Sequence, residues 1–243
     1  MRLVIVRHGD PDYEHDSLTP TGWEEAKLVA DRISKLDVKE FYVSPLGRAR
    51  DTASFTLEKM HKEATICEWL REFQGAINRP DVTEHKSIAW DWLPADWTKD
   101  ENYFRRDLWD TTEIMKEGKV QEEYDWVIKS FDELLAKHGY AREGEYYRVE
   151  NANNDTLVFF CHFGLECVLL SHLMNVSPMI LWHHTAAAPT SVTTVYTEER
   201  RKGIASFRVA AFGDISHLYA ANREPSFSAR FCELYDNTDE RHD

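Results

Sequence analysis

The sequence predicts an α/β fold in which a mostly parallel sheet lies between layers of helices. Short runs of branched apolar residues alternate along the chain with segments of helical spacing. Two of the apolar runs, residues 3–6 and 157–160, have the composition of strands buried on both faces. The chain has 243 residues and 42% hydrophobic content, which is enough for one substantial core. We therefore expect a single domain over 1–243.

Helix-start signals follow the first two predicted strands. Thr19 before Pro20 predicts an N-cap with proline at the first helical position, and apolar residues then recur at helical spacing. The next strand is expected in "EFYVS", where Ser44 and Pro45 repeat the same start signal for a second helix. This alternation is typical of units in which a helix follows each strand.

The remainder of the chain is expected to continue this pattern after an interruption. "ATICEWLREF" is predicted as a third strand, whereas 74–118 shows no clean period and is rich in tryptophan, charge and turns. A long helix is expected from about Val120. It is followed by the strand "TLVFFCH", the helix "GLECVLLSHLMN" and the strands "TSVTTVYTEE" and "IASFRVAAFG". We expect 75–118 to form a cap insertion and 236–243 to form a solvated acidic tail.

Charge and composition exclude several classes of protein. Acidic residues number 43 against 29 basic ones, a formal net charge of −14, which disfavours non-specific binding to nucleic acid or to an anionic membrane. The N-terminal apolar run is far shorter than that of a signal peptide, and no segment is long enough to span a bilayer. The four cysteines show no C-x-x-C spacing, so we expect no zinc site. A cytoplasmic protein with reduced thiols is the expectation.

Basic residues follow three of the predicted strands. Arg7 and His8 end the first strand, Arg48 lies in the first turn of the helix after the second, and His162 ends the strand "LVFFC". Because the carboxyl ends of parallel strands meet at one edge of a sheet, these four side chains are expected to converge. Arginine forks match phosphate oxygens, and a neutral histidine offers a nucleophilic ring nitrogen. This grouping predicts a site for a phosphate group.

The four motifs "VRHGDPDY", "SPLGRARDTA", "LREF" and "CHFG" resemble, in this order, the signatures of the histidine phosphatase superfamily, which contains the cofactor-dependent phosphoglycerate mutases. The resemblance runs from the N-terminus to about Leu218 and is interrupted by the insertion. It implies a three-layer, phosphoglycerate mutase-like fold. It also implies a hydrolase that acts through a phosphohistidine on a small phosphorylated metabolite, with neither metal nor other cofactor.

The resemblance assigns roles to individual residues. His8 is the expected nucleophile, and Glu72 is the expected proton donor and acceptor, because Phe163 stands where one branch of the family has an aspartate donor. Asp10 and Glu14 are the competing donors. The full set of expected catalytic residues is His8, Glu72, His162, Arg7 and Arg48. The expected substrate-binding residues are Arg7, Arg48, His162, Phe163, Asp10 and, from the insertion, Arg105 and Arg106.

Some positions depart from the family pattern. Pro11 and Glu14 stand where a threonine and an asparagine are common, and Phe163 stands where many members have glycine. "EFQGA" differs from the mutase pattern "ERHYG", which favours a phosphatase over a mutase-type phosphotransferase. A non-catalytic phospholigand-binding protein is the other alternative, whereas no ligand set for a metal-dependent phosphoesterase is evident. The strand "TSVTTV" leaves a homodimer open, and the sequence does not identify the substrate.

Overall fold

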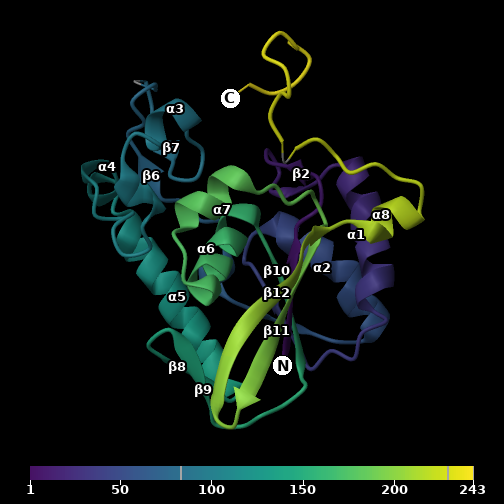
Figure 1. Ribbon diagram of the computed structural model, residues 1–243. Coiled ribbons are helices and arrows are strands. Elements are labelled where there is room, and N and C mark those ends of the chain that lie inside the picture. The colour runs from purple at the N-terminus through teal and green to yellow at the C-terminus, as the bar shows by residue number, and fades with distance from the viewer. Residues whose placement is uncertain (83, 229, 243) are drawn as a thin grey trace.

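The computed structural model describes residues 1–82, 84–228 and 230–242. An eight-stranded mixed sheet runs through its centre in the order β5–β4–β10–β1–β11–β12–β9–β8 (Figure 1). Its strands are β1 (Arg2–Arg7), β4 (Glu40–Val43), β5 (Ala64–Ile66), β8 (Tyr140–Glu143), β9 (Tyr146–Val149), β10 (Thr156–Cys161), β11 (Val192–Arg201) and β12 (Ile204–Asp214). The neighbours β5, β4, β10 and β1 are parallel, whereas the other four strands are antiparallel. The predicted α/β fold is confirmed, with its parallel strands forming the core of the sheet.

Helices cover both faces of this sheet (Figure 1). One layer holds α1 (Pro20–Ile33) and α2 (Gly47–Met60), and the other holds α5 (Val120–Lys137), α6 (Phe163–Met174) and α7 (Pro178–His184). The alternation along β1 explains both layers. Val4 and Val6 pack in the cluster with α1 and α2, whereas Leu3 and Ile5 pack in the cluster with α5 and α6. The run is therefore buried on both faces, as predicted.

The first helix begins as its sequence predicts. Thr19 is the N-cap of α1, its hydroxyl accepts from Gly22 N at 3.1 Å, and Pro20 is the first helical residue. Two short strands, β2 (Pro11–Asp12) and β3 (Ser17–Leu18), form a hairpin between β1 and this helix. The turn after β1 is thereby held beside the N-terminus of α1.

The hairpin of β8 and β9 was not visible in the sequence. The two strands pair with each other, and β9 adds them to the edge of the sheet beside β12. Each of these strands buries only one residue, Tyr140 in β8 and Tyr147 in β9. A strand that buries a single side chain has neither a run of apolar residues nor an alternation of apolar and polar ones. The spacing of apolar residues therefore could not predict it.

The sequence left open that "TSVTTV" could serve as a dimer edge, but this strand is not at an edge of the sheet. Its last four residues begin β11, which is paired on one side with β1 and on the other with β12. An interior strand has no unpaired backbone groups to offer a second chain.

The insertion packs on the helical layer of α6 and α7. It contains β6 (Ala76–Ile77), β7 (Ser87–Ile88), α3 (Pro94–Trp97), a 3₁₀ helix (Glu101–Phe104) and α4 (Glu113–Glu117). Trp109 lies edge-on to Trp182 of α7 at 5.7 Å between ring centroids. Ser177 donates its hydroxyl proton to the Tyr103 carbonyl at 2.6 Å. The segment is buried through aromatic contacts that are scattered along it, which explains why its apolar residues show neither helical nor strand periodicity.

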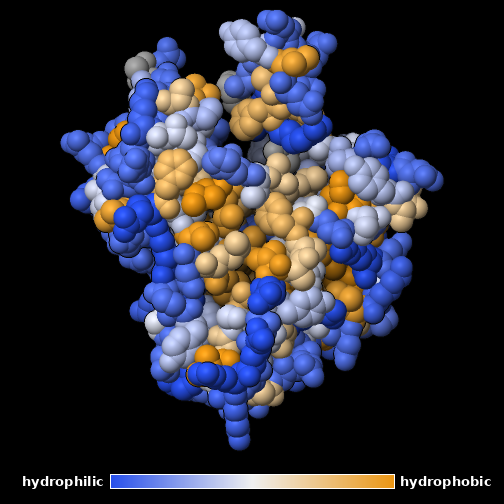
Figure 2. Space-filling model, viewed as in Figure 1, coloured by the Kyte–Doolittle hydropathy of each residue, from blue (hydrophilic) through white to orange (hydrophobic). Residues whose placement is uncertain are grey.

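After α8 (Ser216–Ala220), the described residues up to 242 form no further helix or strand. Most of the described residues between 230 and 242 are exposed, and Arg241 lies 3.7 Å from Asp91 of the insertion. Figure 2 shows this segment above a face where apolar side chains gather around α6 and α7, bordered by hydrophilic residues. Within the described ranges, no helix has the length and apolarity needed to cross a membrane.

Candidate active site

His8 follows the last residue of β1 and lies at the carboxyl edge of the parallel strands. It is buried, and its main-chain N–H donates to the Cys161 carbonyl of β10 at 3.0 Å. Ring nitrogen Nδ1 lies 2.7 Å from the Gly9 carbonyl, a bond that only an N–H can make, so the proton of neutral His8 is on Nδ1. Nε2 then carries the lone pair. Burial, together with the charges of Arg7 and Arg48, holds the pKa of His8 well below its usual value, so the nucleophile is neutral at pH 7.

Gly9 allows this turn to approach the helix that follows. A Cβ at Gly9 would lie 2.8 Å from the carbonyl oxygen of Gly22 in α1. The Gly9 N–H donates to the Thr52 hydroxyl of α2 at 2.9 Å. The glycine of the "RHG" motif is therefore required by the close packing of backbone around His8.

Two arginines converge on His8 from different elements. Arg7 ends β1, and Arg48 is the second residue of α2; their exposed fractions are 6% and 9%. A terminal guanidinium nitrogen of Arg7 donates to the Ala187 carbonyl. A terminal nitrogen of Arg48 donates to the Asp16 carboxylate at 2.6 Å. Both Nε atoms are buried with no partner among the residues that the structure describes. Buried donors are nearly always paired, so this pair of guanidiniums forms a cradle suited to an anion.

His162 completes the cluster from the end of β10. It is fully buried at the N-cap of α6, and its ring centroid lies 5.0 Å from that of His8. The Ser44 hydroxyl accepts from Leu46 N and lies 2.7 Å from His162 Nε2. If the Ser44 hydroxyl donates its proton to His162 Nε2, the proton of neutral His162 is on Nδ1. This Nδ1 is buried and has no hydrogen-bond partner among the described residues. Burial lowers the pKa of His162 well below its usual value, and the neighbouring His8 lowers it further.

The structure corrects the expected role of Ser44. The second helix begins at Gly47 with Leu46 as its N-cap, so Ser44 lies before the helix. Its hydroxyl instead orients His162, because the loop from β4 passes beside the end of β10.

Glu72 reaches the same cluster, although it does not end a strand as predicted. β5 stops at Ile66, and a 3₁₀ helix (Glu68–Leu70) intervenes before Glu72. Its Oε1 accepts from Phe73 N at 2.9 Å and from Leu165 N at 3.0 Å. Oε2 has no partner among the described residues. Burial raises the pKa of Glu72 against the opposing effect of those two N–H groups and the arginines. The arrangement holds one oxygen and leaves the other for a proton.

Asp10 is not brought into this group. Its Oδ2 accepts from Thr19 Oγ1 at 2.7 Å, and its Oδ1 accepts from the hydroxyls of Ser226 and Ser228, each at 2.8 Å. The Asp10 carboxylate therefore accepts from three hydroxyl groups, and the two serines among them attach the C-terminal segment to the turn after β1. Glu14, the other competing donor, is exposed in the loop between β2 and β3.

Arg105 and Arg106 bond to acidic residues outside the cluster. Arg105 lies beside Asp107 at 3.4 Å, and Arg106 contacts the carboxylate of Glu145. The carbonyl of Glu145 accepts from the side chain of Asn175, the C-cap of α6, whereas His162 caps the other end of that helix. A 12-residue helix is about 18 Å long, so the expectation that these two arginines bind the substrate is not supported by the geometry.

Phe163 lies beside Glu72 together with Trp90, a residue that the sequence analysis did not single out. Trp90 donates from Nε1 to the Phe73 carbonyl at 2.8 Å, and its ring meets that of Phe163 edge-on at 6.0 Å. A Cβ at Gly164 would lie 2.7 Å from Trp90 Nε1 and 2.8 Å from Glu72 Oε1. Four tryptophans stand close together in the insertion sequence, and nothing there distinguishes Trp90 from its neighbours.

Replacing Gly164 by alanine is therefore expected to lower kcat by roughly 10- to 100-fold, because the methyl group displaces Glu72 or Trp90 and misplacement of about 1 Å carries such a loss. Steady-state kinetics on an alkyl phosphate give the measurement, and thermal denaturation establishes that the variant is folded. Unchanged kcat in a folded variant would contradict the expectation that close packing around Gly164 is needed for catalysis.

Glu166 is a second residue that the sequence analysis missed. It is buried in the first turn of α6, its main-chain N–H donates to the His162 carbonyl at 2.9 Å, and its Oε1 has no described partner. Burial raises its pKa to about 7, which the Thr193 hydroxyl and the charge of Arg7 oppose. A glutamate within the apolar first half of this helix was the available signal.

Replacing Glu166 by glutamine is expected to raise the free energy of unfolding at pH 8 relative to the natural chain, and to leave it similar near pH 4.5. The folded-state pKa, about 7, exceeds the ordinary value of 4.5, so the natural chain loses stability as pH rises between these values. The difference corresponds to roughly 3 kcal/mol at most. Chemical denaturation of both proteins from pH 4.5 to pH 8.5 measures it. A stability difference that does not vary with pH would contradict the raised pKa.

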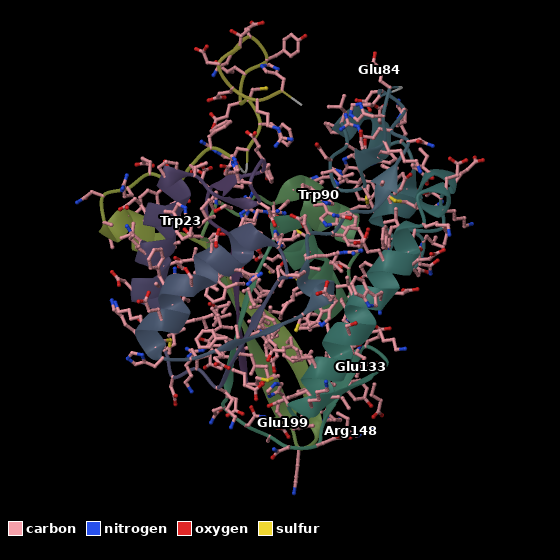
Figure 3. All side chains as sticks on the ribbon, turned by 180° about the vertical axis from the view of Figure 1, so that it is seen from behind. Trp23, Glu84, Trp90, Glu133, Arg148 and Glu199 are labelled. Atoms are coloured by element: carbon pink, nitrogen blue, oxygen red, sulfur yellow. The ribbon has the colours of Figure 1, made fainter. Side chains whose placement is uncertain are left out.

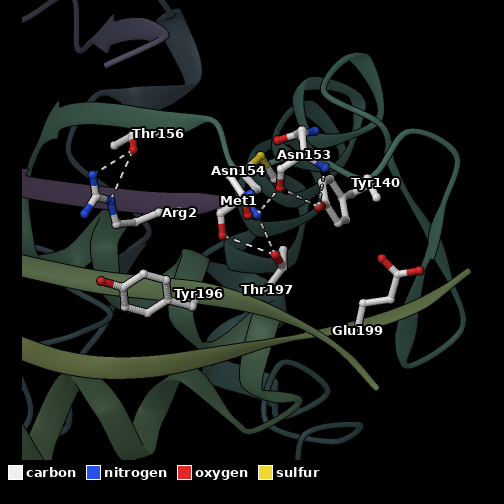
Figure 4. Close-up of a pocket in the computed structure, with 10 residues that line it drawn as sticks. Met1, Arg2, Tyr140, Asn153, Asn154, Thr156, Tyr196, Thr197 and Glu199 are labelled. Atoms are coloured by element: carbon white, nitrogen blue, oxygen red, sulfur yellow. Dashed lines mark hydrogen bonds between the residues drawn. The ribbon is translucent and has the colours of Figure 1, made fainter. Parts of the chain in front are cut away.

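A groove of about 570 Å³ lies at the opposite end of β1 (Figure 4). Met1, Arg2, Tyr140 and Asn153 are among the residues that line it, and the terminal ammonium of Met1 donates to the Asn153 carbonyl at 2.7 Å. Six residues of strand, about 20 Å, separate it from His8. Within the described ranges, no group of three or more His, Cys, Asp or Glu side chains is arranged to hold a metal ion.

Comparison with known proteins agrees with this geometry. The model of the histidine phosphatase superfamily (branch 1) matches residues 3–209. A 2,3-bisphosphoglycerate-dependent phosphoglycerate mutase from Thermoplasma acidophilum is 29% identical over 28% of this chain and 40% of its own length. A 2-carboxy-D-arabinitol-1-phosphatase from Triticum aestivum is 28% identical over 45% of this chain and 26% of its own. The chain thus spans less than half the length of these two relatives.

A solved structure shares the fold over most of both chains. A histidine-to-alanine mutant of the phosphoserine phosphatase of Entamoeba histolytica, in complex with phosphoserine, has a TM-score of 0.58 at 19% identity, and the match covers 89% of this chain and 98% of that chain. The order of the motifs, the convergence of His8, His162 and the two arginines, and the match of the family model over most of the sequence agree. The chain belongs to the histidine phosphatase superfamily, branch 1.

Proposed function

We propose that the protein hydrolyses a small phosphorylated metabolite through a phosphohistidine intermediate at His8, without a metal ion. The observation that carries this proposal is the pairing of a neutral His8, whose Nε2 is unprotonated, with two buried arginines whose Nε donors have no described partner. A site that only binds a phosphate needs the arginines but has no use for an adjacent nucleophile and acid.

The first chemical step transfers the phosphoryl group to His8. Nε2 attacks phosphorus in line with the ester oxygen, the P–O bond breaks, and its electron pair goes to the leaving alcohol. Glu72 Oε2 supplies the proton that this alcohol oxygen takes up. Arg7, Arg48 and the Nδ1–H of His162 bind the equatorial oxygens of the phosphoryl group, where negative charge is spread in the transition state.

The second step reverses these roles. Water attacks phosphorus, its proton passes to the Glu72 carboxylate, and the P–N bond breaks with its electron pair returning to Nε2 of His8. Phosphate leaves, and the enzyme returns to its starting protonation state. One carboxyl group serves as acid and then as base, for which a raised pKa is suited.

The insertion, 75–118, is proposed to act as a cap that selects the substrate. Trp90 supports this role, because it lies against Phe163 and is bonded to the residue after Glu72. The packing of Trp109 on α7 fixes the insertion above the same helical layer. Arg105 and Arg106, which were expected to carry out the selection, contact Asp107 and Glu145, and the proposal does not depend on them.

Turnover of para-nitrophenyl phosphate in the presence of EDTA tests the proposed function. We expect hydrolysis that EDTA does not reduce and that vanadate inhibits, because vanadate adopts the trigonal-bipyramidal geometry of the transferring group. Loss of activity with EDTA that added metal restores would contradict a metal-independent reaction. A parallel assay with 3-phosphoglycerate distinguishes release of phosphate from transfer to a second hydroxyl.

A further inference from the structure

The position of Glu72 defines where the leaving group of a substrate lies. The ester oxygen must lie within hydrogen-bond reach of Glu72 Oε2 when it receives the proton, so the alcohol continues past Glu72 and away from His8. The other carboxyl oxygen, Oε1, is held by Phe73 N and Leu165 N. Both of those residues are buried, and the partly exposed side chains that flank them are Trp90, which donates to the Phe73 carbonyl, and Phe163, two residues before Leu165.

Those bordering side chains are aromatic. Phe163 is the first residue of α6, directly after His162, and is partly exposed. Trp90 is also partly exposed, and it meets Phe163 edge-on at 6.0 Å with an angle of 76° between the ring planes. Its Nε1 is already bonded to the Phe73 carbonyl, so the ring offers the substrate an apolar surface and no donor.

Trp90 and Glu72 both approach the backbone of Gly164 closely. Both Trp90 Nε1 and Glu72 Oε1 lie within 2.8 Å of the point where a side chain on Gly164 would begin. This glycine permits the tryptophan ring, the acid and the start of α6 to meet. The two rings thus form one continuous surface beside the acid, which we call the aromatic wall, consisting of Trp90 and Phe163.

The charges beside the aromatic wall are already paired. Arg79 lies against Asp81 at 2.5 Å and Asp91 at 3.9 Å, and Arg241 lies 3.7 Å from Asp91. On the other side of the site, Arg48 contacts Asp16. A second anionic group on a substrate would therefore meet carboxylates and cations that are already engaged.

We propose that the aromatic wall of Trp90 and Phe163 binds the alcohol part of the substrate, and that the preferred substrates are phosphomonoesters whose alcohol carries an aromatic or apolar body and no second anionic group. The proposal rests on the proposed function, because it places the alcohol by its contact with Glu72. Stacked or edge-on aromatic contacts and burial of a ring supply the preference.

Three esters with the same kind of leaving oxygen test this preference. The three esters are propyl phosphate, 3-phenylpropyl phosphate and 3-carboxypropyl phosphate, the last being the carboxylate ester. All are primary alkyl phosphates, so differences in kcat/KM report the rest of the alcohol and not its ability to leave. We expect the phenylpropyl ester to exceed the propyl ester by roughly tenfold, and the carboxylate ester to fall below both. A ratio near one, or a preference for the carboxylate ester, would overturn the proposal.

Variants assign the preference to the aromatic wall. Trp90→Ala and Phe163→Ala should each reduce the tenfold ratio to about threefold or less. Trp23→Ala is the matched control, because Trp23 is also partly exposed but packs against Phe55 in the layer of α1 and α2 (Figure 3). It should leave the ratio unchanged. An unchanged ratio in both wall variants would overturn the assignment, and two independent variants guard against loss of folding in one.

Binding of non-hydrolysable analogues separates this proposal from the proposed function. Calorimetry with propylphosphonate and 3-phenylpropylphosphonate on the natural chain gives the same comparison without turnover. Tighter binding of the phenyl compound supports the aromatic wall even if hydrolysis fails. Hydrolysis of propyl phosphate with equal binding of the two phosphonates would refute the wall and leave the proposed function intact.

Discussion

Replacing His8 by alanine is expected to lower kcat/KM for para-nitrophenyl phosphate by about 10⁴-fold or more, as removal of a nucleophile does in other covalent enzymes. The physical reason is that Nε2 of His8 carries the nucleophilic lone pair. Nδ1 donates its proton to the Gly9 carbonyl, and burial together with two neighbouring arginines keeps the ring neutral. Steady-state kinetics on the purified variant measure the loss.

The control for this variant is a histidine on the surface. His15→Ala removes an exposed ring that pairs with Asp12 near the same edge of the sheet, and activity should remain within about twofold of the natural chain. Binding of inorganic phosphate to His8→Ala, followed by calorimetry, should persist because Arg7 and Arg48 remain. Retention of full turnover in His8→Ala would exclude the covalent mechanism.

Replacing Glu72 by glutamine is expected to lower kcat for alkyl phosphates by ~10²–10⁴-fold, the usual contribution of general acid–base catalysis. Glutamine keeps the shape of the side chain and, through its carbonyl oxygen, the bonds from Phe73 N and Leu165 N. It removes only the transferable proton. The loss should be smaller for para-nitrophenyl phosphate, whose leaving group departs readily as an anion.

Asp10→Asn is the matched comparison. Because the Asp10 carboxylate accepts three hydroxyl bonds away from the cluster, its replacement should weaken the attachment of the C-terminal segment and leave alkyl phosphate hydrolysis within a few-fold of the natural chain. If Asp10→Asn abolishes alkyl phosphate hydrolysis while Glu72→Gln does not, Asp10 is the proton donor and the assignment here is wrong.

The parts of the fold that the sequence predicts are those with a local signal. Thr19 and Pro20 mark a helix start because an N-cap and an N1 proline act within one turn. The strands that become β1 and β10 carry apolar runs because both of their faces are buried. The same signals place Arg7, His8 and His162 at strand ends, and the topology of a parallel core then brings them together.

The parts that the sequence does not predict depend on contacts between distant segments. Ser44 has the composition of an N-cap, but its hydroxyl bonds to His162, 118 positions away. Arg106 stands among tryptophans in an insertion beside the motif of Glu72, yet its partner is Glu145 of a different hairpin. Periodicity and motif position contain no information on which way such a side chain points.

Trp90 and Glu166 were missed for a related reason. The position of Trp90 depends on Gly164, because the absence of a Cβ there lets both the indole and the Glu72 carboxylate approach the start of α6. Glu166 acquires its raised pKa from complete burial in α6, which is a property of the packed protein. Neither residue belongs to a motif, so only their surroundings in the folded chain identify them.

The central claim is that the phosphoryl group is transferred to His8 during turnover. Its most direct test is rapid quenching of the natural chain with an alkyl phosphate labelled in the phosphoryl group, followed by peptide mapping under alkaline conditions. We expect an acid-labile, base-stable adduct on the peptide that contains His8, formed within the first turnover and absent from His8→Ala. Hydrolysis with no labelled peptide, or with the label on any residue other than His8, would contradict the account.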